Sequence, residues 1–170
     1  MRHFLIIIFL FLFFNPFFVN AEEHLIDSIP FFPATDYQCG PASLAMVFNY
    51  LGLKISVEEI SKDILSKEGR GTVDFDMILY PQKKDFNSFQ YRGSLEDLKE
   101  KIKQNKPLIV MVDEGFWFYK KYHYMVVVGF NDAHVIVNSG EDRNKKIEVE
   151  KFIKKWQKAD YWTLLIEKKT

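Results

Sequence analysis

The chain has 170 residues, a length that suits one domain. Hydrophobic residues make up 48% of it and charged residues 27%, which is ordinary for a globular protein. Lysine plus arginine equals aspartate plus glutamate at 23 each, so the formal net charge is zero. This balance gives no reason to expect a nucleic acid or an anionic membrane surface as a partner, and we predict neither.

The N-terminal residues are typical of an export signal. A short basic start precedes an unbroken apolar run over residues 4–14, and Val19-Asn20-Ala21 offers small residues where a signal peptidase reads. We expect a signal peptide over 1–21, one mature domain over 22–170, and an exported protein, periplasmic or extracellular. The alternative is an uncleaved membrane anchor, although the run is shorter than the roughly 20 residues that span a bilayer.

The mature chain should begin extended over residues 22–38, because Pro30 and Pro33 disfavour a helix. Helical spacing and capping residues predict helices over about 41–51, 56–67, 73–80 and 94–105, with a turn or two of helix over 152–156. Runs of β-branched and aromatic residues predict strands over 86–91, 108–112, 124–130, 135–137 and 162–166. Helices that mostly precede strands indicate an α+β fold with an antiparallel sheet.

Cys39 is the one cysteine of the chain, so the chain cannot form an internal disulfide. It directly precedes the helix expected from about Pro41, and a helix N-terminus lowers a thiol pKa and offers N–H groups to an oxyanion. Gly40 would let the backbone approach a substrate closely. A buried structural cysteine is the plain alternative. We predict that Cys39 is a nucleophile.

His123 directly precedes the apolar strand expected over 124–130, which would give a base a rigid mount. Of the other histidines, His3 lies in the signal segment, His24 near the mature N-terminus, and His134 at the far end of the same hairpin. We predict that His123 is the general base. A histidine satisfied within a loop is the alternative.

Asn138 ends the strand that returns towards His123, and arms of equal length would bring the two residues together. A side-chain oxygen there would fix the imidazole tautomer that faces the thiol. We therefore expect Asn138 to orient the base, with Ser139, Glu141 or Asp142 taking that role if the register slips. The plain alternative is that Asn138 is only a turn residue.

These motifs resemble those of the bacteriocin-processing, double-glycine leader peptidases, a family of papain-like cysteine peptidases. Residues 36–47 (DYQCGPASLAMV) are similar to the nucleophile motif, 123–130 (HYMVVVGF) to the histidine strand, and 135–140 to the acid or amide strand that follows. The resemblance covers most of 28–167 and is closest to exported, stand-alone members. It implies a papain-like fold in which N-terminal helices pack on a C-terminal antiparallel sheet.

The same resemblance implies hydrolysis of a peptide or protein substrate through an acyl-enzyme, with small residues such as glycine beside the cut and no cofactor or metal. Two departures stand out. The family usually has Asp-Pro where this chain has Asn138-Ser139. Its oxyanion glutamine usually lies a few residues before the nucleophile, where this chain has Pro33 and Ala34, so Gln38 becomes the candidate oxyanion donor.

The aromatic stretch Phe116-Trp117-Phe118-Tyr119 precedes His123. We expect it to form a wall of the substrate cleft, with Trp117 as the cleft residue; for Phe116 and Phe118, packing in the core is an equal alternative.

Three other functions stay open. One is a peptide-binding domain that has the fold but has lost the catalytic activity, and the missing oxyanion glutamine favours this function. An acyltransferase would use an amine to intercept the acyl-enzyme. A metal site could use Cys39, His123 and a carboxylate, although zinc sites usually show denser Cys and His spacing. The sequence predicts no particular oligomeric state.

Overall fold

The computed structural model describes residues 22–65, 72 and 74–169, so the expected signal peptide lies outside the described residues. In that part of the chain, no helix has the length and apolar character to cross a membrane. The elements are, in chain order, β1 His24–Leu25, η1 Asp36–Gln38, α1 Cys39–Tyr50, α2 Val57–Ile64, α3 Asp74–Lys83, β2 Phe86–Arg92, α4 Leu95–Lys103, β3 Leu108–Asp113, β4 Tyr122–Phe130, β5 His134–Ser139, β6 Asp142–Glu148, α5 Val149–Gln157 and β7 Trp162–Lys168.

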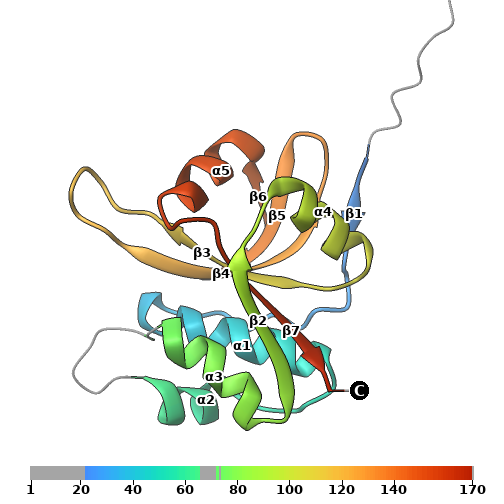
Figure 1. The fold of residues 1–170 in the computed structure, drawn as a ribbon, viewed down its shortest axis with the longest axis vertical. Coiled ribbons are helices and arrows are strands. Elements are labelled where there is room, and N and C mark those ends of the chain that lie inside the picture. The colour runs from blue at the N-terminus through green and yellow to red at the C-terminus, as the bar shows by residue number, and fades with distance from the viewer. Residues whose placement is uncertain (1–21, 66–71, 73, 170) are drawn as a thin grey trace, which may run out of the picture.

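One antiparallel sheet organises the described residues. Its strands follow the order β2-β7-β3-β4-β5-β6, and the short β1 pairs with the far end of β4. Helices α1, α2 and α3 lie on one side of the sheet, and α4 and α5 lie on the other (Figure 1). The predicted α+β fold, with N-terminal helices packed on an antiparallel sheet, is confirmed.

Helix α1 is the central helix of the lower layer. Every residue over 40–48 is buried, because β4 covers one side of the helix and α2 packs along another. A helix that is apolar all round is typical of such an interior position. This packing fixes the N-terminal end of α1, and with it Cys39, relative to β4.

The helix boundaries follow local chemistry. Ser56 and Glu59 form the capping box of α2, and Ser94 Oγ accepts from Asp97 N at the start of α4. The prediction that α3 ends ahead of Pro81 is wrong, because Pro81 lies inside the helix. It falls in the last turn, where its missing N–H removes only one helical hydrogen bond.

The C-terminal end of α2 also differs from the prediction. The helix ends at Ile64, and Leu65 is extended and forms a bridge with Thr72. Residues 66 and 67, which we expected at the end of this helix, lie outside the described residues.

Two strands escaped prediction. β6 has the sequence DRNKKIE and is exposed along nearly all of its length, so it shows neither an apolar run nor a regular alternation. It pairs only with β5 and forms the edge of the sheet, where charged residues are usual. β1 has only two residues, which is too short for any periodicity.

Candidate active site

Cys39 is the first residue of α1, two residues earlier than the expected helix start at Pro41. The 3-10 turn η1 runs directly into the helix, and the backbone of Cys39 is helical, with φ −57° and ψ −38°. The residue is half-buried. Its thiol therefore lies in the first turns of a helical stretch, where the helix dipole favours a thiolate.

His123 is the second residue of β4 and pairs with Val112 of β3. The residue is buried, with 5% of its surface exposed. Its ring Nε2 lies 2.9 Å from Oγ of Ser139, the last residue of β5. The imidazole is thus positioned by its own strand, β4, and by the hydroxyl of Ser139 on the neighbouring strand β5.

Asn138 does not occupy the position that we expected against this ring. The β4–β5 register pairs Asn138 with Val126, and paired residues point to the same face of a sheet. Val126 and His123 are three residues apart, so they point to opposite faces. Ser139, the next residue after Asn138, therefore shares the face of His123.

The side chain of Asn138 has a different task. Its Oδ1 accepts from the backbone N–H of Asn144 at 2.9 Å. The register between β5 and β6 shifts at this point, and Asn144 has a positive φ of 53°. Asn138, which is only 2% exposed, thus satisfies an amide that the bulge removes from the ladder.

Two further links bring the segment around Cys39 to the same end of β4. Ala34 N donates to Gly140 O at 3.0 Å, which ties the stretch before Cys39 to the turn directly after Ser139. Burial, Asp74 and the nearby thiol of Cys39 together raise the pKa of Tyr124, the residue next to His123. The first turn of α1 therefore lies beside the start of β4.

Gln38 lies directly before α1 as the last residue of η1. Its backbone N–H donates to Thr35 O at 2.9 Å, and its side chain forms no capping bond with the helix. The residue is half-buried, as is Cys39. It is thus adjacent to the nucleophile candidate.

Gly40 was expected to let the backbone approach a substrate closely. It is buried, and a Cβ built on it would lie 2.8 Å from Thr72 Oγ1 and 2.9 Å from Thr72 Cβ. The missing side chain thus makes room for Thr72 and for Met77, whose Sδ would lie 3.1 Å away. Gly40 is needed for close packing between α1 and the segment that leads into α3.

Trp117, which we expected in a wall of the substrate cleft, lies on an exposed loop. It is 85% exposed at the tip of the β3–β4 loop, and Phe116 and Phe118 are exposed by 76% and 92%. The core-packing alternative for these two phenylalanines is therefore wrong. The loop projects from the sheet instead of lying along it (Figure 1).

The metal alternative gains no ligand set: across residues 22–65, 72 and 74–169 no group of three or more His, Cys, Asp and Glu residues could hold a metal ion.

Ser139, which sequence reasoning kept only as an alternative, contacts the imidazole through its Oγ. The alternation of side chains along β4 and β5 would have identified Ser139, but only if the pairing of Asn138 with Val126 had been known. Thr72 was missed altogether, because nothing in its sequence context indicates contact with Gly40.

Comparison with known proteins agrees with this architecture. A family model described as the Peptidase_C39 like family matches residues 20–163. No curated protein sequence matches the chain. Among solved structures, a C39-like peptidase from Bacillus anthracis superposes with a TM-score of 0.73 at 15% identity, covering 88% of this chain and 99% of that one.

Two transporter-associated domains are also similar. The peptidase domain of Streptococcus ComA, a bifunctional ABC transporter involved in quorum sensing, has a TM-score of 0.69 at 22% identity over 83% of this chain and 99% of its own. A double-glycine motif protease from an AMS/PCAT transporter, solved with its leader peptide, has a TM-score of 0.66 at 22% identity over 82% of this chain and 91% of its own. By the family match over residues 20–163 and by its fold, the chain belongs to the Peptidase_C39 like family.

Proposed function

We propose that this protein is an exported cysteine peptidase that cleaves peptide bonds with Cys39 as nucleophile and His123 as base. The observation that carries the proposal is the contact between His123 Nε2 and Ser139 Oγ. This contact lies at the start of β4, and the first turn of α1 lies beside it. A strand-mounted imidazole oriented by a second group, beside a thiol at a helix start, is the arrangement that nucleophilic catalysis requires.

In this mechanism Ser139 replaces Asn138 as the orienting residue. With Nε2 directed at Ser139, we assign Nδ1 to the thiol of Cys39. Nδ1 takes the thiol proton, and the thiolate attacks the substrate carbonyl carbon. The backbone N–H of Cys39 and the side chain of Gln38 are the candidate donors to the oxyanion.

Collapse of the tetrahedral intermediate breaks the C–N bond and leaves a thioester on Cys39, while the imidazolium of His123 gives its proton to the leaving amine. Water then attacks the thioester and loses a proton to His123. The thioester C–S bond breaks, which releases a carboxylic acid and restores the thiol. No cofactor enters any step.

The proposed substrate is a peptide with small residues beside the cut. Family membership supports this class, as does the leader peptide bound by the AMS/PCAT relative. Export rests on the signal-like residues 1–21, and it would place the activity in the periplasm or outside the cell.

The lone cysteine makes a direct test possible, because alkylation of the protein reports Cys39 alone. The second-order rate constant with iodoacetamide, measured from pH 5 to 9, should exceed that of glutathione near neutral pH. His123→Ala should bring the rate down to that of a free thiol. His134→Ala, which changes a half-buried histidine at the far end of the same hairpin, should leave it unchanged. A wild-type rate equal to that of glutathione would defeat the proposal.

A peptide-binding domain is the second candidate, and it is favoured by the lack of the family's glutamine in the region of Pro33 and Ala34. Mass spectrometry of peptides incubated with the protein separates the possibilities. Hydrolysed fragments that disappear in Cys39→Ser indicate a peptidase. New amide products without hydrolysis indicate an acyltransferase. Bound but intact peptides, together with an unreactive thiol, indicate a binding domain.

A further inference from the structure

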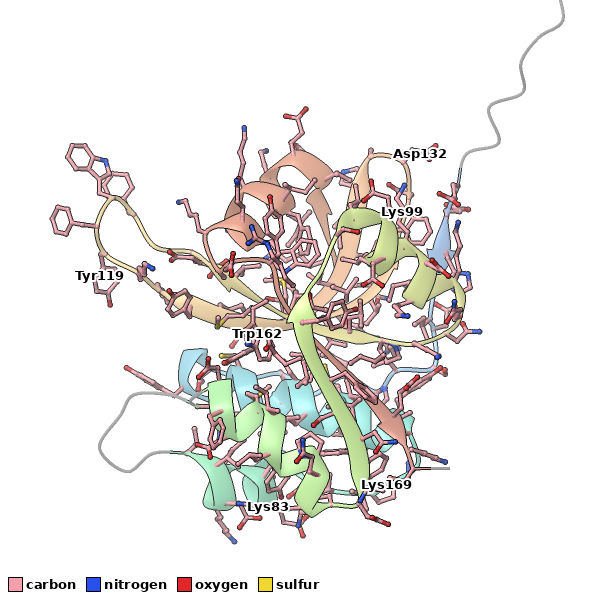
Figure 2. All side chains as sticks on the ribbon, viewed as in Figure 1. Lys83, Lys99, Tyr119, Asp132, Trp162 and Lys169 are labelled. Atoms are coloured by element: carbon pink, nitrogen blue, oxygen red, sulfur yellow. The ribbon has the colours of Figure 1, made fainter. Side chains whose placement is uncertain are left out.

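The loop between β3 and β4, residues 114–121, carries four consecutive aromatic residues that are exposed to an unusual degree. The exposed fractions are 76% for Phe116, 85% for Trp117, 92% for Phe118 and 68% for Tyr119. The loop extends away from the domain in Figure 1, and the aromatic rings at its end, among them the labelled Tyr119, point outwards in Figure 2. Contiguous exposed apolar surface of this kind marks an interaction site.

The base of this loop is built to hold its tip. The buried carboxylate of Asp113 accepts from Gly115 N at 2.7 Å and from Lys121 N at 3.0 Å. Glu114 N donates to Lys121 O at 2.8 Å, which closes the two arms.

The tip itself is a tight turn. Tyr119 N donates to Phe116 O at 3.0 Å, and Trp117 has a positive φ of 54°. A Cβ on Gly115 would collide with Tyr119 O, so the arms approach as closely as glycine permits. The rings are therefore presented by an ordered turn whose own hydrogen bonds keep them away from the core.

Positive charge lies directly behind the aromatic tip. Lys120 and Lys121 are both exposed, and Lys158, the residue that follows α5, reaches Gly115 O with its Nζ at 3.5 Å. Glu114, the exposed acid at this base, is paired with Lys155 at 3.1 Å. This order matches an anionic bilayer that the loop enters tip first. The aromatic rings would reach the membrane interface, and the lysines behind them would stay level with the negatively charged headgroups.

We propose that the β3–β4 loop is a membrane-docking finger that inserts Phe116, Trp117, Phe118 and Tyr119 into the interface of a bilayer containing anionic phospholipid. This inference goes beyond the proposed peptidase activity. The shape decides between lipid and protein as the partner. The rings project from a convex tip, and a bilayer can surround such a tip on all sides, whereas a bound peptide would cover only one.

The zero net charge of the whole chain gave no hint of this surface, because a sum over all residues hides a local arrangement. The finger would also position the candidate active site. His123 follows Phe118 by five residues along the arm that continues into β4, so it would lie within about 17 Å of the inserted rings at roughly 3.3 Å per extended residue. Peptides at the membrane surface would then be within reach.

The tryptophans allow a local test on the full chain. Of the three, Trp156 is 1% exposed and Trp162 is 7% exposed, so quenching by lipid reports Trp117. With vesicles of phosphatidylcholine and phosphatidylglycerol, Trp117 emission should shift to the blue, and brominated acyl chains should quench it. Trp117→Ala should abolish both signals. This readout is local to the loop, so anchoring through residues 1–21 would not produce it.

Matched variants test the two parts of the finger. Phe118→Ser should reduce quenching strongly, whereas Phe89→Ser, at a 50% exposed position on β2, should not. Lys120→Gln should weaken binding to the anionic vesicles by about fivefold, the usual contribution of one lysine near such a surface. Lys83→Gln, at the bottom of the view in Figure 2 and away from the loop, should have no effect.

Three outcomes would overturn the proposal. Trp117 emission could be the same with and without vesicles. Pure phosphatidylcholine could quench as well as the anionic mixture does. The emission could already be blue-shifted without lipid and depend on protein concentration, in which case the finger would bind a second copy of the chain. None of these outcomes bears on the reactivity of Cys39, so the peptidase proposal is tested separately.

Discussion

Ser139 Oγ lies 2.9 Å from His123 Nε2, while the adjacent Asn138 points to the other face of the sheet. One hairpin thus places two polar residues side by side in sequence and gives them separate tasks. Ser139 contacts the candidate base, and Asn138 closes a bulge. Substitutions at these two positions should therefore separate catalysis from stability.

Replacing Ser139 by Ala should lower the alkylation rate of Cys39 at pH 7 by about two- to tenfold, the effect of losing one neutral hydrogen bond. Ser139→Asp should act in the opposite sense. A carboxylate beside the ring favours imidazolium, so it should raise the pKa of His123 and extend the thiolate–imidazolium pair to higher pH. Rate profiles from pH 5 to 10 would show both effects. Equal profiles for the wild type and Ser139→Ala would contradict the orienting role.

Replacing Asn138 by Ala should destabilise the protein by about 1 kcal/mol, because the N–H of Asn144 loses the hydrogen bond that it donates to Asn138 Oδ1. The free energy of unfolding in urea measures this loss. Ser139→Ala is the matched control, one residue away, and should cost less. If Asn138→Ala instead slowed alkylation without changing stability, Asn138 would hold the role that the sequence alone suggested.

The strands at the centre of the sheet could be predicted because their composition reflects burial on both faces. Two such strands are Leu108–Asp113 and Tyr122–Phe130, which are buried along nearly all of their length. Their apolar runs were sufficient to predict both. Cys39 and His123 were chosen as candidates for their places at the start of a helix and of a strand, and the structure has them at those places. Their catalytic roles stay a prediction.

Register is what the sequence could not provide. A bulge at Val128 adds one residue to β4, and β5 reaches Asn138 only three positions after Val135, so Asn138 falls opposite Val126. No composition signal marks either feature. The contact of Thr72 with Gly40, and the projection of Trp117 into solvent, also depend on tertiary geometry that local pattern does not carry.

Gly40→Ala tests the close contact beside Cys39. Alanine improves helix propensity by up to about 1 kcal/mol. The new Cβ would lie 2.8 Å from Thr72 Oγ1, however, and overpacking typically costs about 1–3 kcal/mol. We therefore expect a net loss of about 1 kcal/mol in urea unfolding. Adding Thr72→Gly removes both close atoms, so the double variant should lose less than the two single changes combined. Simple additivity would contradict the contact.

Asp113 links the pH dependence of stability to the β3–β4 loop. Burial alone would raise the pKa of its carboxyl, but the N–H groups of Lys121 and Gly115, helped by Lys158 and Lys120, outweigh burial and hold the pKa below the ordinary value of 3.8. The folded state therefore prefers the carboxylate. Its contribution to stability is present above about pH 4 and is lost as the pH falls through the folded-state value.

Asp113→Asn should show this directly. At pH 7 the variant should be less stable by about 1–2 kcal/mol, because hydrogen bonds to a charged acceptor are roughly twice as strong as those to a neutral one. The difference from the wild type should stay constant down to about pH 4 and shrink below it, as the wild-type carboxylate takes up its proton. Urea unfolding from pH 7 to pH 2.5 measures this, with the exposed Asp85→Asn as the control. A difference that persisted at pH 2.5 would mean that the charge of Asp113 does not hold the arms of the loop together.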